Sequence, residues 1–260
     1  MSHTDFDIRM KEYEHADRQF LPESPYYVIR LDGKGFSKYT KSFKGDGPDP
    51  FNALLHEAFT ESCKELGKQV EGAMACYTQS DELSILIKGY EDDPSRTPWF
   101  GGNVQKWVSV SASILTAKFN SVISRSTNNV NAPLAYFDSR VFSLPKNEVN
   151  NYFVWRQKDA IRNSVSMYAH TNFSHKSLHG VDTTGQKEKL LEKGLDWNAL
   201  EMWKQRGTLV AKVKKLVDAE WTDKKGVKHL EKDVERSVWE KVSLPLFTEK
   251  SILEVVKVET

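Results

Sequence analysis

The stretch from Ala73 to Lys88 constrains the fold of this chain more than any other. Two apolar runs of strand length, Ala73 to Tyr77 and Leu83 to Ile87, flank a short polar segment that ends in Asp81 and Glu82. Such a pattern predicts a β-hairpin with carboxylates at its tip. Acids at a tip are usually solvated turn residues, because turns favour Asp and Ser for local backbone reasons. The hairpin alone therefore does not predict a catalytic or binding role for Asp81 and Glu82.

A second acid, Asp32, lies upstream at the end of another strand-like run. The residues from Tyr26 to Leu31 are aromatic or aliphatic apart from Arg30, and they stop at a turn with two glycines, Asp32-Gly-Lys-Gly35. This predicts a buried strand that ends in a glycine-rich turn. Glycines there can take positive φ and let backbone N–H groups approach a phosphate.

The order of the elements brings the two acids together. An amphipathic helix is predicted from Phe51 to Leu66, and another from Asn103 to Ser124. Strand, helix, two strands and helix form the opening of a ferredoxin-like βαββαβ unit, which is also the palm of nucleotide polymerases. We therefore predict an α/β (α+β) fold with a mainly antiparallel sheet. Residues 1–145 would form a palm-like catalytic domain, and residues 146–260 a helical and β extension packed on the palm as one unit.

In such a palm Asp32 and Asp81 lie side by side. Two carboxylates in a partly buried site repel each other and are stable together mainly with a divalent cation between them. Oxygen ligands completed by substrate phosphates suit Mg²⁺, and a pair of such ions suits phosphoryl transfer. We predict catalytic roles for Asp32 and Asp81, two bound Mg²⁺ ions, and a supporting role for Glu82.

Composition excludes several classes of protein. The chain has 260 residues, 39% hydrophobic and 28% charged, with a net charge of +1, so any contact with nucleic acid must come from local patches. No apolar run reaches the roughly 20 residues that span a membrane, and the N-terminus lacks a signal pattern, so we expect a cytoplasmic protein. Cys63 and Cys76 are most simply buried thiols, although the sequence leaves one disulfide open.

Several ordered segments resemble the tRNA(His) guanylyltransferase superfamily, whose enzymes add nucleotides to RNA 5′ ends in the 3′-to-5′ direction. The similar segments, spread over roughly the first 160 residues, are Arg30-Leu-Asp-Gly-Lys-Gly-Phe36, Tyr77-Thr-Gln-Ser-Asp-Glu82, Trp99-Phe100 with Lys106, Phe137-Asp-Ser-Arg140 and Tyr152-Phe-Val-Trp-Arg-Gln-Lys-Asp159. Arg206-Gly-Thr-Leu-Val210 is also similar.

The resemblance implies a set of site residues and partners. Metal would be held by Asp32, Asp81 and the Gly33 carbonyl. Nucleotide contacts would come from Asp32, Gly33, Lys34, Gly35, Phe36, Ser37, Ser80, Asp81 and Lys106, the last steadying a triphosphate, with Lys44 a weaker candidate. RNA contacts are expected from Arg156, Asn163, Lys204 and Arg206. The expected partners are tRNA, ATP or GTP as substrates, and further copies of the chain in a homotetramer.

The segment Asp159-Ala-Ile-Arg-Asn-Ser164 departs from the eukaryotic pattern. Eukaryotic members carry a His-Ile-Asn-Asn run here, and Ile161 stands where the histidine would be. The chain is thus more similar to the guanylyltransferase-like branch, which repairs truncated tRNA 5′ ends against the opposite strand as template. Two alternatives stay open: addition of the extra guanosine to tRNA(His), and a non-catalytic RNA-binding palm protein.

The C-terminal part carries weaker signals. His175 and His179 are spaced for one helical face and a transition metal, but no cysteine or acid completes the set, so we favour a solvent-facing or RNA-facing role for them and His170. Basic residues outnumber acidic ones from Glu201 to Lys232, which with Trp203 and Trp221 favours contact with RNA. Residues 234–258 are expected to add edge strands.

Overall fold

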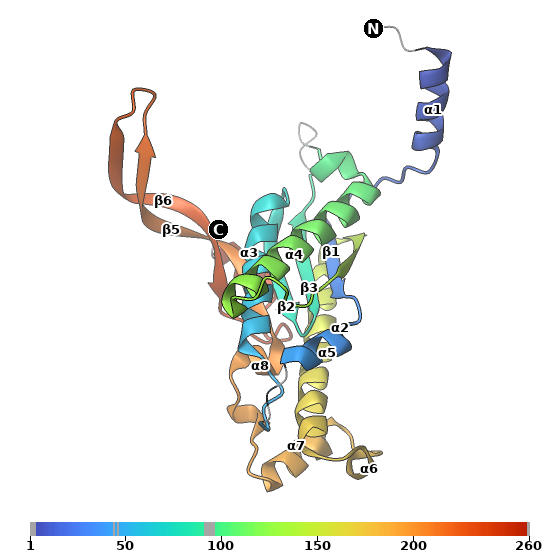
Figure 1. Ribbon diagram of the computed structural model, residues 1–260, viewed down its shortest axis with the longest axis vertical. Helices are drawn as coiled ribbons and strands as arrows, with labels where there is room; N and C mark the ends of the chain where they lie inside the picture. Colours follow the sequence, from blue (N-terminus) through green and yellow to red (C-terminus); the bar gives the residue numbers. More distant parts are fainter. Residues whose placement is uncertain (1–3, 44, 46, 91–96, 259–260) are drawn as a thin grey trace.

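A six-stranded antiparallel sheet organises the protein (Figure 1). The computed structural model describes residues 4–43, 45, 47–90 and 97–258, so Lys44 lies outside the described residues. The spatial order of the strands is β4-β1-β3-β2-β5-β6. Their bounds are Tyr26–Gly33 (β1), Ala73–Gln79 (β2), Glu82–Lys88 (β3), Phe137–Leu144 (β4), Thr208–Thr222 (β5) and Lys228–Val242 (β6). The fold is therefore mixed α/β, as the sequence predicts.

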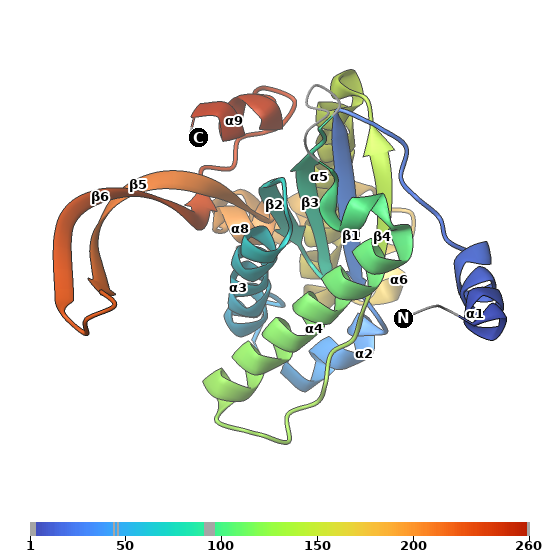
Figure 2. The ribbon, with the colours of Figure 1, turned by 90° about the horizontal axis from the view of Figure 1, so that it is seen from above.

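Helices cover both faces of this sheet, and the alternation of side chains along each strand supplies a core on each side. Tyr27, Ile29 and Leu31 of β1 face α3 (Ala53–Gln69) and α4 (Val104–Thr127). Tyr26 and Val28 face the opposite layer, formed by α5 (Lys146–Asn172) and α9 (Ile252–Val258). Figure 2 shows the three layers from above. Strands buried on both faces are held rigidly, which suits them to position a site at their ends.

The predicted helices form where their caps and periodicity place them. Asn52 accepts a hydrogen bond from the backbone N–H of Leu55 and starts α3, and Asn103 does the same for Lys106 and α4. Along α3 the apolar residues recur every three or four positions, and Phe59 and Leu66 are buried against the sheet. The helix predictions from residue 51 and residue 103 are thus confirmed, with ends shifted by a few residues.

Residues 146–260 extend the same sheet. The first part of β5 pairs with β2, from Ala75 opposite Ala211 to Thr78 opposite Thr208. The later part of β5 and most of β6 form a long two-stranded hairpin that projects from the body (Figures 1 and 2). Between α5 and β5 lie short helices around a third small core: α6 (His175–Leu178), α7 (Thr183–Glu192) and α8 (Met202–Arg206).

One prediction for the C-terminal part is wrong. Residues up to Val242 do form the outer strand β6, but the expected strand over the last residues is the helix α9. Ile252, Val255 and Val256 are buried against the core under α5. This spacing puts all three on one helical face, whereas a short apolar run by itself does not distinguish helix from strand.

Other features of the described residues agree with the composition. Cys63 and Cys76 are buried free thiols, as expected. Among the described helices, none has both the length and the apolar character needed to cross a bilayer. The N-terminal helix α1 (Asp5–Ala16) has no buried residue and stands apart from the body.

Candidate active site

The two predicted acids meet at one end of the sheet. Asp32 is near the end of β1, and Asp81 lies in the two-residue turn between β2 and β3. The backbone N–H of Gly33 donates to the carbonyl oxygen of Asp81 over 3.1 Å, and Asp32 lies directly opposite Glu82 in the β1–β3 ladder. Ser80, the first residue of the turn, takes a positive φ of 51°. Such backbone strain is found preferentially at functional sites.

The electrostatics of this corner favour a bound cation. Burial raises the pKa of the Asp81 carboxyl, and the charge of Asp32 raises it further. Glu82 Oε1 is buried without a hydrogen-bond partner among the described residues. In those same residues no three His, Cys, Asp or Glu side chains form a complete metal cage. Two carboxylates with open positions fit Mg²⁺, which commonly binds one or two protein carboxylates and takes its other ligands from water and phosphates.

The glycine-rich turn after Asp32 is closely packed. A Cβ atom at Gly33 would collide with the ring of Phe36, and Gly35 has a φ of 64° that favours glycine. The backbone N–H of Lys34 donates to Tyr136 over 2.8 Å, so the N–H groups of Gly33 and Lys34 are both engaged within the protein. Any phosphate contact made by backbone N–H groups of this loop therefore falls to residues 35–37.

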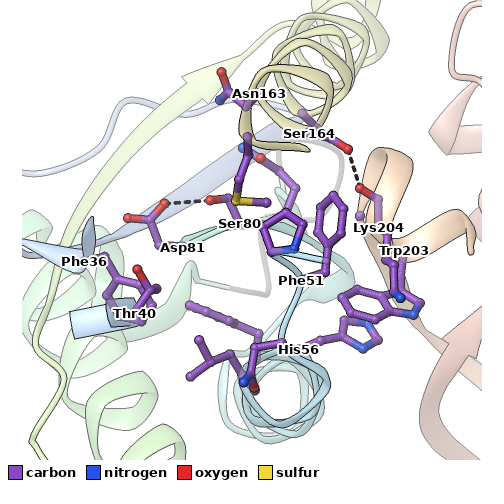
Figure 3. A pocket seen from close by; sticks show the side chains of 18 of the residues that line it. Phe36, Thr40, Phe51, His56, Ser80, Asp81, Asn163, Ser164, Trp203 and Lys204 are labelled. Atoms are coloured by element: carbon purple, nitrogen blue, oxygen red, sulfur yellow. Dashed lines mark hydrogen bonds between the residues drawn. The ribbon is translucent and has the colours of Figure 1, made fainter. Parts of the chain in front are cut away.

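A cavity of about 490 Å³ opens beside the acids (Figure 3). One end is lined by Ser80 and Asp81 of the turn and by Phe36 and Thr40 after the glycine loop. It extends along α5 to an aromatic end next to α8. Asp32, Gly33, Lys34 and Gly35 are outside the lining, so only part of the predicted nucleotide set faces this space. The volume is that of a small-molecule site.

Three side chains that form the aromatic end had no predicted role in a small-molecule cavity. His56 stacks on Trp203 with ring centroids 4.2 Å apart and planes 11° apart, and Phe51 meets Trp203 edge-on. His56 Nε2 lies 2.8 Å from Thr208 Oγ1, and burial, helped by the charge of Lys241, lowers the pKa of His56 to about 4. The ring is therefore neutral near pH 7. The sequence favours an RNA contact for Trp203, and it predicts His56 and Phe51 only as part of an amphipathic helix.

Glu82 and Arg156 form a buried ion pair behind the acids. Arg156 Nη1 lies 2.8 Å from Glu82 Oε2 and 3.6 Å from Asp159 Oδ2. Burial raises the pKa of Glu82, and the guanidinium opposes that rise. Arg156 is only 6% exposed, so its guanidinium does not form part of an RNA-facing surface. Its geometry suits holding Glu82 in place beside Asp32.

The other three residues with a predicted RNA role lie near α8. Asn163 and Lys204 line the cavity, and Lys204 Nζ pairs with Asp49 over 2.7 Å. Arg206 donates to the carbonyl oxygen of Leu244 over 3.1 Å. Asn163 and Lys204 therefore lie in the cavity wall, whereas Arg206 lies outside the lining.

Lys106 is not brought to the acids within one chain. Its neighbour Trp107 packs edge-on against Tyr27, with centroids 5.4 Å apart, at the start of β1. Asp32 is five residues further along that strand, a span of roughly 17 Å. The predicted contact of Lys106 with a triphosphate bound at these acids therefore has no support from its position in this chain.

His170, His175 and His179, near the end of α5 and beyond it, are all exposed, which agrees with the favoured solvent-facing prediction. α6 ends at Leu178, so His175 and His179 do not share a continuous helical face. His170 and His175 lie together instead, with ring centroids 4.6 Å apart.

Comparisons with known proteins agree with this geometry. A family model described as tRNAHis guanylyltransferase (Thg1) matches residues 7–145. A bacterial tRNA(His) guanylyltransferase-like protein solved in complex with ATP is 39% identical, with a TM-score of 0.79, over 95% of this chain and 96% of that chain. A bacterial protein of the same description in complex with GTP is 37% identical, with a TM-score of 0.76, over 97% and 99%.

The tRNA(His) guanylyltransferase of Saccharomyces cerevisiae is a more distant neighbour. It is 21% identical, with a TM-score of 0.65, and the match covers 85% of this chain and 96% of that chain. At this identity the similarity concerns the fold alone.

Proposed function

We propose, because the chain belongs to the tRNAHis guanylyltransferase (Thg1) family, that it extends truncated tRNA 5′ ends in the 3′-to-5′ direction, using the opposite strand as template. Membership of the family makes it a nucleotidyltransferase. The observation that carries the proposal is the acid corner formed by Asp32 and Asp81 at the mouth of a nucleotide-sized cavity. ATP or GTP would activate a 5′-monophosphate by transferring its AMP or GMP group to it and releasing pyrophosphate. The 3′-hydroxyl of the incoming nucleotide would then attack the 5′ phosphorus of the RNA, releasing that AMP or GMP, or releasing pyrophosphate when the RNA already carries a 5′-triphosphate.

The polymerase-palm interpretation supports this chemistry. Strands in the order β4-β1-β3-β2 with α3 and α4 on one face are the arrangement of a ferredoxin-like βαββαβ unit. In this arrangement the ends of β1 and of the β2–β3 hairpin lie next to each other, so a palm presents its acids at one edge.

The Asp32 and Asp81 carboxylates and the Gly33 carbonyl are the groups that would hold two Mg²⁺ ions. Bound there, Mg²⁺ lowers the pKa of an attacking hydroxyl and neutralises charge on the leaving oxygen. Glu82 does not need to be a ligand in this scheme, because Arg156 holds one of its oxygens. Glu82 instead has a supporting role, because its ion pair with Arg156 fixes the strand position opposite Asp32.

The cavity would hold the nucleoside triphosphate with its phosphates toward Ser80 and Asp81. The base would then lie toward Phe51, His56 and Trp203, because aromatic rings favour a nucleobase over a phosphate. A neutral His56 adds no positive charge to that end. The solved relatives are in complex with ATP in one case and GTP in another, which supports a purine nucleotide as the ligand.

Template-dependent repair is favoured over guanosine addition to tRNA(His) by position 161. Ile161 packs against the small core around Val165 and Trp197. The histidine of the eukaryotic pattern has no counterpart here, so a contact made by that ring is not available to this chain. Family resemblance also leads us to propose tRNA-bound homotetramers, which light scattering would test.

The decisive experiment supplies the purified protein with Mg²⁺, labelled nucleotides and a tRNA lacking its first nucleotide. We expect one nucleotide to be added at the 5′ end, complementary to the opposite base, and a changed opposite base to change the nucleotide added. Guanosine addition whatever the opposite base would favour the tRNA(His) alternative. No 5′ extension, or extension by Asp81→Ala at the parent rate, would contradict the proposed function.

A further inference from the structure

We propose that Trp155, together with Arg140, forms the surface that receives the 5′-terminal nucleotide of the RNA, on the β4 side of the acid corner. This rests on the proposed function. The cavity lies on the β2 side, and neither Trp155 nor Arg140 lines it. An enzyme that joins a nucleotide to an RNA end must hold both at one phosphorus. With the cavity taken by the nucleotide, the RNA end approaches across β4.

Trp155 is an exposed aromatic side chain with a rigid support. It is 54% exposed, although a Trp side chain is large and apolar. The guanidinium carbon of Arg156 lies 3.6 Å from the centroid of its ring, and the ring of Tyr152 meets it from the side with centroids 6.0 Å apart. Because Arg156 is buried and ion-paired, the Trp155 ring is held in one place, with much of its surface open to solvent.

The same contacts connect Trp155 to the acid corner. Arg156 binds Glu82, and Glu82 lies opposite Asp32 in the β1–β3 ladder. A base stacked on Trp155 would thus lie a few side chains from the carboxylates. A single exposed aromatic side chain is common on protein surfaces. The position of Trp155 beside the acids is what makes it a candidate for binding the RNA substrate.

Arg140 supplies a charge suited to a terminal phosphate. In the β1–β4 ladder Arg140 pairs with Arg30 and Asp138 pairs with Asp32, so these side chains share the face that α5 covers. The Arg140 side chain is 50% exposed and lies 3.0 Å from Asp138. Arginine binds phosphate oxygens through a planar fork of donors. The hydrogen bond to Asp138 raises the pKa of Arg140, and the charges of Asp32 and Glu82 raise it further, which is consistent with a position near the corner.

The chemistry of the surface favours an RNA end over a second protein. Single-stranded or frayed RNA ends are recognised by stacking of bases on Trp and by Arg contacts to phosphates. Arg162, 68% exposed and paired with Asp159 one turn after Arg156 on α5, adds a second exposed guanidinium near the same place.

The test measures steady-state extension of a tRNA lacking its first nucleotide by Trp155→Ala, Trp155→Phe and the parent. We expect Trp155→Ala to raise KM for tRNA roughly tenfold or more, which is the usual effect of removing a stacked aromatic. KM for the nucleotide should change less than twofold. Trp155→Phe, which keeps a ring, should recover most of the loss. Thermal unfolding of each variant checks that the fold is intact.

Phe6 offers a matched control in α1. It is 59% exposed, and the guanidinium carbon of Arg9 lies 5.7 Å from its ring centroid, so it is also an exposed aromatic side chain beside an arginine, on a helix without buried residues. Phe6→Ala should leave KM for tRNA within twofold of the parent. Trp221, 46% exposed and stacked on His229 in the long hairpin, is the rival stacking site. An effect of Trp221→Ala with none of Trp155→Ala would overturn the proposal and assign the stacking to the hairpin.

Two further results would also overturn it: an unchanged KM for tRNA in Trp155→Ala, or an equal fall in kcat for every substrate with both KM values unchanged. The second result would mean that Trp155 acts only through Arg156 and Glu82. Direct binding of a 5′-phosphorylated RNA, measured by fluorescence anisotropy, separates this proposal from the proposed function. A parent that fails to extend tRNA but binds this RNA through Trp155 would contradict the function alone.

Discussion

Two hairpins of the same sheet differ in how they are held. The β2–β3 hairpin is short and lies between helices on both faces, and nearly all of its strand residues from Ala75 to Ile87 are buried. The β5–β6 hairpin begins in the sheet with four buried residues, Thr208 to Ala211, and then continues into solvent with both faces largely exposed. Backbone pairing is similar in both. Burial on both faces is what allows the first hairpin to hold charged groups in fixed positions.

The difference predicts where substitutions matter. A carboxylate at the tip of the buried hairpin has fixed neighbours, so its charge can act on a substrate. A carboxylate on the exposed hairpin is screened by water and salt. Two experiments compare the two hairpins directly with matched variants, and two more test the buried body and the exposed hairpin separately.

The largest effect is expected from Asp81→Asn. Removing this carboxylate removes a group that would hold the metal, and a bound metal contributes several kcal/mol, so we expect extension to fall by about a thousandfold. Stability should be unchanged or slightly higher, because burial and Asp32 raise the pKa of Asp81 and the neutral side chain relieves this repulsion. Single-turnover extension and urea unfolding measure the two quantities.

Asp233→Asn is the control for that substitution. Asp233 lies on the long hairpin with a φ of 55°, a conformation that Asn also adopts readily. Extension by this variant should match the parent. Equal losses of activity in the two variants would contradict the prediction that the carboxylate of the buried hairpin contributes more to extension than that of the exposed hairpin.

The second comparison removes one partner from an ion pair in each region. Arg156→Ala leaves Glu82 buried and unpaired, which should lower the free energy of unfolding by about 3 to 5 kcal/mol. Lys214→Ala breaks the exposed pair with Glu235, whose side chains are 53% and 61% exposed, and should cost less than about 1 kcal/mol. Urea denaturation of both variants gives the difference, and equal costs would show that Glu82 is more hydrated than its burial indicates.

The third comparison uses pH. The pKa of His56 is lowered to about 4 in the folded protein, below the usual value of 6.5. The unfolded chain therefore binds a proton first as pH falls, so the contribution of His56 to stability is complete above about pH 6.5 and is lost between pH 6.5 and 4. His56→Gln should show a shallower loss of unfolding free energy over this range. Parallel curves for the two proteins would mean that His56 is not shielded from water.

The smallest effect is expected when the exposed part of the long hairpin is removed. Replacing residues 215–236 by an Asn-Gly turn joins Lys214 to Ser237, which are paired in the ladder. Because this segment buries little apolar surface, the free energy of unfolding should change by less than about 1 kcal/mol. Binding of ATP, measured by calorimetry, should also be unchanged. A large loss of stability would mean that the long hairpin supports the body after all.

Much of the site could be predicted because it depends on local patterns. The two apolar runs on either side of Ser80 and Asp81 predict the hairpin, and Gly33 and Gly35 predict the turn after Asp32. Asn52 and Asn103 mark the starts of two helices. Each of these signals acts within a few residues, so it is present in the sequence whatever the rest of the chain does.

The other features of the site, and the helix α9, depend on contacts between residues that are far apart in the chain. The resemblance implies that Arg156 contacts RNA, but in the structure Arg156 is buried and pairs with Glu82. Lys106 precedes Trp107, which packs at the start of β1, so the length of β1 separates Lys106 from Asp32. The aromatic end of the cavity joins His56 and Trp203, which are far apart in the chain, and α9 is a helix because its apolar face meets the core under α5.

The sequence by itself determined most of the elements before residue 145, their order and the two acids at the ends of strands, because backbone preferences and periodicity are local properties. Only the tertiary structure decided which charges are buried, which side of the acids is enclosed and which is open. Burial and electrostatic environment arise from packing between segments far apart in the chain, and no short stretch of sequence contains them.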